Sequence, residues 1–157
     1  NNDYRTFLSQ QGLHVEPGNY IDSEGKVLGS HCGFCNYTIG QRKGLGIALG
    51  APKHVLKIDA KTNTVMLGDH DDLLTYDVYA DQIRIRDWQW LADSPQVTAR
   101  IRYKSPAVPA TLQWTLTDES QSPIAHLHFD QAVWGVTPGQ SLVLYKDGLL
   151  VGGGIIR

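Results

Sequence analysis

Val97-Thr98-Ala99-Arg100-Ile101-Arg102-Tyr103-Lys104 alternates between apolar or aromatic side chains and polar or basic side chains. Successive side chains of a β-strand point to opposite faces, so Arg100, Arg102 and Lys104 would share one face. The other face would carry Val97, Ala99, Ile101 and Tyr103. Three cations on one face repel one another unless solvent or an anion lies opposite. The stretch therefore predicts a strand whose basic face either pairs with carboxylates or receives a polyanion.

Five further segments of the second half are short and β-prone, and Pro and Gly separate them without any helical pattern. They are residues 78–86, 110–116, 124–129, 142–145 and 149–156. Six short antiparallel strands predict a closed or nearly closed barrel, because closure hides the strand edges. In the first of these segments Arg84 and Arg86 alternate with isoleucines, which predicts a second basic row.

The first half predicts a small β domain with a Gly-rich loop. Two pairs of strand-like segments each flank a turn signal, 19–21 with 26–28 and 54–58 with 64–67. One short N-terminal helix is expected from Asp3 to Gln11. The acidic stretch from Gly68 to Asp77 is predicted to be an irregular, solvated linker. We therefore expect a mainly β chain with two domains, residues 1–74 and 75–157.

Composition narrows the class of protein. Charged residues make up 19% and hydrophobic residues 41% of the 157 residues, which excludes disordered and fibrous proteins. A net charge of −2 argues against a surface that is basic throughout, but 14 Lys and Arg residues allow a local basic patch. No apolar run approaches the length of a membrane span, and two cysteines do not make a secreted disulfide framework. We expect a cytoplasmic protein with no signal peptide and no membrane partner.

The stretch from Tyr37 to Ile47 holds three glycines around Gln41, Arg42 and Lys43. Glycines leave backbone N–H groups uncovered, and a turn of this kind with two cations can hold a phosphate or a nucleic-acid backbone. An ordinary hairpin connection has the same composition. From these residues alone the ordinary connection is the better interpretation.

Two other groups of residues resemble metal or redox sites. Cys32 and Cys35 form a C-x-x-C, but a structural zinc would need two more ligands and a redox pair needs a stabilised thiolate. We expect free thiols, at least one of them buried, and no metal. His126 and His128 alternate onto one strand face, a spacing that can chelate a metal but is more typical of a polar sheet face.

Three motifs in the chain resemble those of the bacterial tRNA-specific 2-thiouridylases. They are His31 and Gly33 with Tyr37–Gly46, then Arg100–Tyr103, then Val136–Ser141 followed by Gly152–Ile156. The resemblance extends from about Tyr4 to Ile156. It implies a small central β domain followed by a six-stranded antiparallel barrel of the elongation-factor type. It also implies a part in the ATP-dependent replacement of O2 of the wobble uridine by sulfur.

The resemblance further implies which residues touch tRNA. Arg102, Tyr103 and Gln140 match the family positions that do so, and Arg100 and Lys104 share the predicted basic face. Arginine offers a planar fork to phosphate oxygens, and tyrosine can stack on a base or ribose. Gln41, Arg42 and Lys43 are further expected contacts to the tRNA backbone.

Catalysis is expected outside these 157 residues. In the resembled enzymes a Gly-rich pyrophosphate loop binds ATP with magnesium, one cysteine carries a persulfide sulfur, and a second acts in the transfer. No Ser-Gly-Gly-x-Asp loop occurs here, and Cys32 and Cys35 do not match the family's catalytic cysteines. We therefore expect no catalytic residue and no cofactor in this chain, which by itself would be inactive. The full enzyme would receive sulfur from a sulfur-relay protein or a cysteine desulfurase.

Two alternatives stay open at this point. The first is a stand-alone RNA-binding β-barrel without an enzymatic part. The second is a small thiol-redox or metal protein that uses Cys32 and Cys35. The open reading frame before Asn1 would test the first alternative, and a thiol titration with metal analysis would test the second.

Overall fold

The computed structural model describes residues 16–89, 95–117 and 120–157, and the helix expected from Asp3 to Gln11 lies outside them. The chain divides into two compact units, Asn1–Leu73 and Leu74–Arg157. Each unit has its own cluster of buried apolar side chains. The fold is mainly β, and no described helix is long and apolar enough to cross a membrane.

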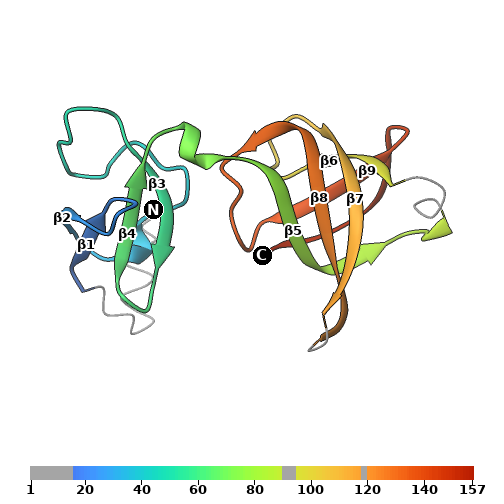
Figure 1. Ribbon diagram of the computed structural model, residues 1–157, viewed down its shortest axis with the longest axis horizontal. Coiled ribbons are helices and arrows are strands. Elements are labelled where there is room, and N and C mark those ends of the chain that lie inside the picture. The colour runs from blue at the N-terminus through green and yellow to red at the C-terminus, as the bar shows by residue number, and fades with distance from the viewer. Residues whose placement is uncertain (1–15, 90–94, 118–119) are drawn as a thin grey trace, which may run out of the picture. The chain divides into compact units, whose positions relative to one another are not determined.

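The first unit contains one four-stranded sheet in the order β2-β1-β4-β3 (Figure 1). The strands are β1 (Gly18–Ile21), β2 (Val27–His31), β3 (His54–Asp59) and β4 (Thr64–Gly68). The predicted strand pairs are confirmed, since β1–β2 and β3–β4 are antiparallel hairpins, and β1 joins β4 in parallel. In the first hairpin Asp22 Oδ1 accepts the backbone N–H groups of Glu24 and Lys26 at 3.0 and 2.9 Å, which closes the turn.

The second unit is a closed barrel in the order β10-β5-β8-β7-β6-β9 (Figure 1). Its strands are β5 (Leu74–Ile85), β6 (Gln96–Arg100), β7 (Val108–Thr117), β8 (Ser120–Trp134), β9 (Ser141–Lys146) and β10 (Leu149–Ile156). Every neighbouring pair is antiparallel. The prediction of a six-stranded antiparallel barrel is therefore confirmed.

The barrel interior is filled by alternate side chains of each strand. Val97 and Ala99 of β6 and Leu142 and Leu144 of β9 are all buried in one cluster. Glycines of β10 make room for larger neighbours. A Cβ on Gly152 would lie 2.6 Å from Cδ1 of Ile85, and one on Gly154 would lie 2.4 Å from Cδ1 of Ile83. The Gly-Gly-Gly run is therefore required where β10 packs against β5.

Two sequence expectations about this unit are wrong. Residues from Leu74 to Asp77 are strand, not linker, because they pair with β8, Leu74 with Trp134 and Asp77 with His128. Strand β6 ends at Arg100, so Tyr103 does not share the buried face with Ile101 and is 90% exposed. Ser105 causes this change of direction. Its Oγ accepts the Arg102 N–H at 3.2 Å and donates to the Arg102 carbonyl oxygen at 2.9 Å, which closes a turn.

Candidate nucleic-acid interface

The turn after β6 exposes some of the predicted contact residues and partly buries another. Tyr103 and Lys104 are exposed at its tip, whereas Arg102 is half-buried at its base. The backbone N–H of Ser105 donates to the Arg102 carbonyl oxygen at 3.1 Å and holds the tip in place. An exposed aromatic ring and a cation are thus presented side by side in the chain.

The Arg102 guanidinium is positioned by the connection between β8 and β9. Its Nη2 donates to Thr137 Oγ1 at 2.9 Å, and its Cζ lies 5.4 Å from the ring centroid of Trp134. Gly135, with a φ of +67°, leaves space for the guanidinium, since a Cβ there would lie 3.0 Å from Nη2. Thr137 Oγ1 in turn donates to the Gly135 carbonyl oxygen at 3.0 Å. The side chain is thereby restrained on two sides before any ligand binds.

The same connection carries Gln140. Its backbone N–H donates to the Thr137 carbonyl oxygen at 3.2 Å, so Thr137 contacts both Arg102 and Gln140. Gly139 N–H donates to the Ile156 oxygen, and Ile156 N–H donates to the Gln140 oxygen, each at 2.8 Å. The turn is therefore attached to the end of β10. Sequence reasoning missed Thr137 and Trp134 as residues that position Arg102, although Thr137 lies inside the quoted Val136–Ser141 motif.

Three of the predicted contact residues have buried polar atoms without a partner. In the described part of the chain Arg100 Nε, Arg102 Nε and Gln140 Oε1 make no hydrogen bond. No described carboxylate forms an ion pair with Arg100, Arg102 or Lys104. Arg100 instead lies over Tyr145, with its Cζ 6.0 Å from the ring centroid. Buried polar groups are normally hydrogen-bonded, so these atoms are suited to a polar ligand.

A cavity of about 440 Å³ opens beside Arg102. Its walls are mainly apolar, from Ala99, Val108, Val133 and Trp134, while Arg102 and Lys104 supply the positive charge. An apolar wall next to cations suits a base or sugar attached to a phosphate.

The Gly-rich loop of the first unit is anchored by Gln41. Its Oε1 accepts the Thr38 N–H at 3.1 Å, and its Nε2 donates to the Lys43 oxygen at 3.0 Å. Its backbone oxygen accepts the Val55 N–H at 2.9 Å. Arg42 and Lys43 are exposed. The loop therefore presents the two cations, while the amide of Gln41 is occupied within the loop.

His31 and Gly33 have structural roles in the same unit. His31 is 5% exposed, its ring packs edge-on against Tyr20 and Tyr37, and its Nδ1 accepts the Gly33 N–H at 3.0 Å. Burial lowers the pKa of His31. Tyr20 donates its hydroxyl to the Leu45 oxygen at 2.6 Å, and burial raises its pKa, so this hydroxyl stays protonated and ties the loop to β1.

Comparison with known proteins identifies the family. The tRNA methyl transferase PRC-barrel domain matches residues 5–69, and the Aminomethyltransferase beta-barrel domain matches residues 80–156. The tRNA-specific 2-thiouridylase MnmA of Natranaerobius thermophilus is 41% identical over 157 residues, which are 99% of this chain and 41% of the relative. That of Moorella thermoacetica is 42% identical over 156 residues, 99% of this chain and 42% of the relative. The chain belongs to the tRNA-specific 2-thiouridylase family. It spans about two fifths of the length of these relatives and corresponds to their C-terminal part.

The two cysteines of the first unit are both at least partly exposed. Both are free thiols, Cys32 exposed and Cys35 partly exposed, so the expectation that at least one is buried is wrong. Cys35 lies within the short 3₁₀ turn η1 (Phe34–Asn36), and Cys32 lies two residues before this turn. Cys32 Sγ lies 3.8 Å from Tyr37 Oη and 3.9 Å from Asn36 Nδ2. No group of three or more His, Cys, Asp or Glu side chains within the described ranges is arranged to hold a metal ion.

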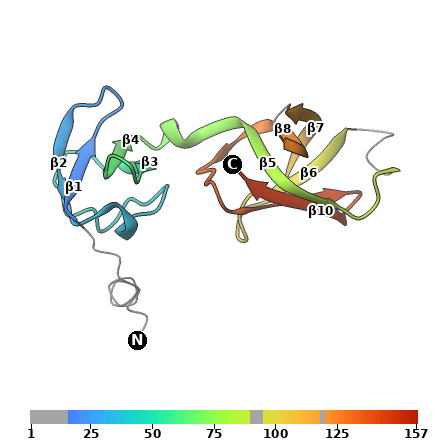
Figure 2. The same cartoon turned by 90° about the horizontal axis from the view of Figure 1, so that it is seen from below.

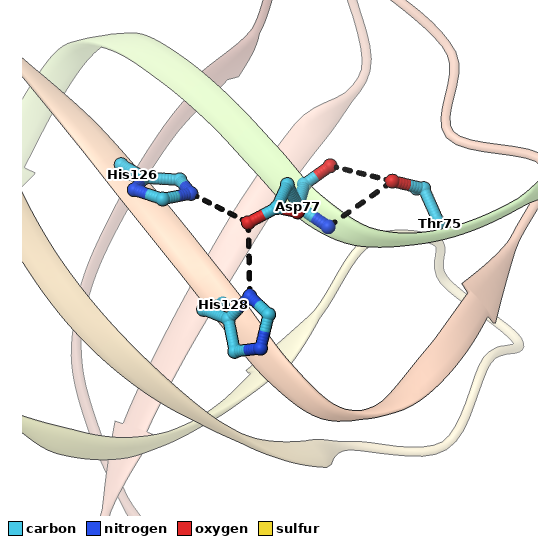
Figure 3. A network of polar contacts seen from close by, with 4 residues as sticks. All are labelled: Thr75, Asp77, His126 and His128. Carbon is cyan, nitrogen blue, oxygen red and sulfur yellow. Dashed lines mark hydrogen bonds and ion pairs between the residues drawn. The ribbon is translucent and has the colours of Figure 1, made fainter.

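The two histidines of β8 share one carboxylate on the barrel (Figure 3). His126 Nε2 and His128 Nδ1 lie 2.8 and 2.9 Å from Asp77 Oδ1. The His126 ring stacks on Tyr79 with a centroid separation of 4.5 Å. Hydrogen bonds from His128 and His126 hold the pKa of Asp77 below its ordinary value. Both imidazoles therefore serve a polar face of the sheet, and their contacts with Asp77 account for the i, i+2 spacing.

Proposed function

We propose that this chain grips and positions tRNA for a tRNA-specific 2-thiouridylase. The observation that carries the proposal is Arg102, which Thr137 and Trp134 hold next to the Gln140 turn while its Nε has no partner among the described residues. A pre-positioned planar guanidinium suits a phosphate, since less conformational entropy is lost when it binds. Tyr103 and Lys104 at the adjacent tip would add a stacking surface and a second cation.

The reaction belongs to the whole enzyme in this proposal. It would adenylate O2 of the wobble uridine with ATP and magnesium and displace the adenylate with persulfide sulfur, as a tRNA-uridine 2-sulfurtransferase. A cysteine desulfurase or a sulfur-relay protein would supply the sulfur, in the cytoplasm. ATP and the catalytic cysteines would lie in the part of the relatives that this chain does not span. The chain would orient the tRNA, and orientation of reacting groups can lower an activation free energy by several kcal/mol.

A tRNA titration tests the proposal. A labelled tRNA with a wobble uridine is titrated with the chain at low and at physiological salt, and fluorescence anisotropy gives the affinity. Arg102→Ala is expected to weaken binding and to reduce the slope of log affinity against log salt by about one. Lys61→Ala, which removes an exposed cation from a turn of the first unit, is the control for net charge. Equal affinities of the unaltered chain and Arg102→Ala at both salt concentrations would contradict the proposal.

A further inference from the structure

Two arginines on different strands, Arg84 of β5 and Arg100 of β6, lie on one row across the outer wall of the barrel. The strand register pairs Arg84 of β5 with Gly153 of β10, Gly153 with Val143 of β9, and Val143 with Arg100 of β6. Paired residues of neighbouring strands face the same side of a sheet, and Arg84 is exposed. Three strand steps place the two arginines roughly 14 Å apart along the row. One arginine from each basic row predicted from the sequence thus lies on the same row in the structure.

A groove of about 550 Å³ lies on this row, and residues of β10 and its neighbours line it. Figure 2 shows strand β10 beside β5, with which it pairs. We call it the glycine groove, and its lining includes Gln82, Arg84, Ser141, Val143, Leu150 and Gly152–Gly154. A Cβ on Gly153 would lie only 2.2 Å from the backbone oxygen of Leu142. No side chain can therefore stand at Gly153 without a shift of the backbone, and the middle of the groove is bare main chain.

The charges around the glycine groove favour an anion. Arg84 donates Nη1 to the Ile83 oxygen at 3.3 Å, and no described carboxylate forms an ion pair with Arg84 or Arg100. Asp81 lies one row away, opposite Ile155, and its Oδ2 is 3.7 Å from Arg157 Nε. The row itself is therefore positive at both ends and carries no acidic side chain between them.

The position of the groove on the barrel favours an RNA backbone as the anion. Ser141, which lines the groove, directly follows Gln140, and Arg100 is two residues before Arg102. The groove thus adjoins the proposed tRNA contacts on the same barrel. Bare main chain at Gly153, on a row with a cation at each end and no aromatic platform, suits a sugar–phosphate strand better than a base.

We propose that the glycine groove is a second contact of this barrel for the sugar–phosphate backbone of the RNA, with Arg84 and Arg100 on different phosphates of one strand. This inference rests on the proposed function. It adds a binding site beyond Arg102, Tyr103 and Gln140, and it predicts that the site reads backbone and not sequence.

Three variants that each change the net charge by one unit test the groove. Arg84→Ala removes a cation at one end of the row, and Val143→Glu places a carboxylate on the row beside Gly153. Gln113→Glu is the matched control, because Gln113 is exposed on β7, three strands from β10 in both directions around the barrel. Affinity for tRNA is measured by fluorescence anisotropy at low and physiological salt, and circular dichroism confirms the fold of each variant.

Arg84→Ala and Val143→Glu are expected to weaken binding roughly fivefold, and Arg84→Ala to reduce the salt slope by about one. The loss is expected to be the same for tRNAs of different sequence, while Gln113→Glu binds like the unaltered chain. If Val143→Glu does not fold, the exposed Arg84→Ala decides alone. Unchanged binding by Arg84→Ala, an equal loss in Gln113→Glu, or a loss restricted to one tRNA sequence would overturn the inference. If Arg102→Ala still weakens binding in that case, the proposed function stands, whereas no binding by the unaltered chain overturns both.

Discussion

Thr137 Oγ1 accepts a hydrogen bond from Arg102 Nη2 at 2.9 Å and joins the turn after β6 to the connection between β8 and β9. These residues are 35 positions apart in the sequence. The hydroxyl group thereby gives the guanidinium its direction, while the Trp134 ring supports its face. Arg102, a predicted contact residue, is thus held by the barrel and not by its own turn alone.

Thr137→Val removes this acceptor with little change of shape. We expect a cost of about 1 kcal/mol in tRNA binding and a smaller change in stability, because the guanidinium keeps Trp134 but loses its anchor. Isothermal titration with tRNA and thermal unfolding measure the two effects. Thr111→Val is the matched control, since Thr111 Oγ1 also accepts a side-chain hydrogen bond, from Gln96, at 2.9 Å. Equal losses in both variants would contradict a positioning role for Thr137.

Tyr103 offers a test that is independent of stability. Because its side chain is 90% exposed, Tyr103→Ala should leave the melting temperature unchanged. If the ring stacks on a nucleotide, tRNA binding should weaken by about 1–3 kcal/mol. Tyr103→Phe keeps the ring and should retain most of the affinity. Loss of binding in Tyr103→Phe as well would point to the hydroxyl group and away from stacking.

Asp77 predicts a dependence of stability on pH. Hydrogen bonds from His128 and His126 lower its pKa in the folded chain, so the ionised carboxylate stabilises the fold above its ordinary pKa of 3.8. That contribution is lost as the pH falls through the lower folded value. Asp77→Asn should therefore be less stable than the unaltered chain at neutral pH, and the difference should shrink below pH 3.8. Urea unfolding over this range measures it, and a difference that is constant with pH would exclude the linkage.

The two thiols should differ in reactivity. Cys32 is exposed and Cys35 is partly exposed, so Cys32 should react first with a maleimide in the native chain. Peptide mapping by mass spectrometry after a short exposure shows which thiol carries the label. Cys32→Ser should remove the fast phase and leave the slow one. Faster labelling of Cys35 would contradict the described geometry of the η1 turn.

Alternation and turn residues were enough to predict every described strand and the closed barrel. Strand periodicity also placed Arg84 and Arg100 on outward faces, because the apolar residues beside them had to be buried. Local patterns did not predict where β6 ends. Ser105 turns the chain after Arg100 by bonding to Arg102, and a period-two pattern continues through Tyr103 regardless.

Partners that are distant in the sequence could not be predicted from it. Asp77 lay in an acidic stretch that resembled a linker, and only the β5–β8 register brings it to His126 and His128. The same holds for Thr137 and Arg102, which meet because β6 pairs with β9. The single row of Arg84 and Arg100 likewise depends on three separate strand pairings.

The two hydrogen bonds between Ile156 and the Gly139–Gln140 turn couple the end of β10 to the turn that carries Gln140. Fraying of β10 from its end would release the turn, and with it the amide of Gln140, before the rest of the barrel loosens. Fraying of the end of β10 would therefore weaken the proposed tRNA contact at Gln140 before it unfolds the barrel.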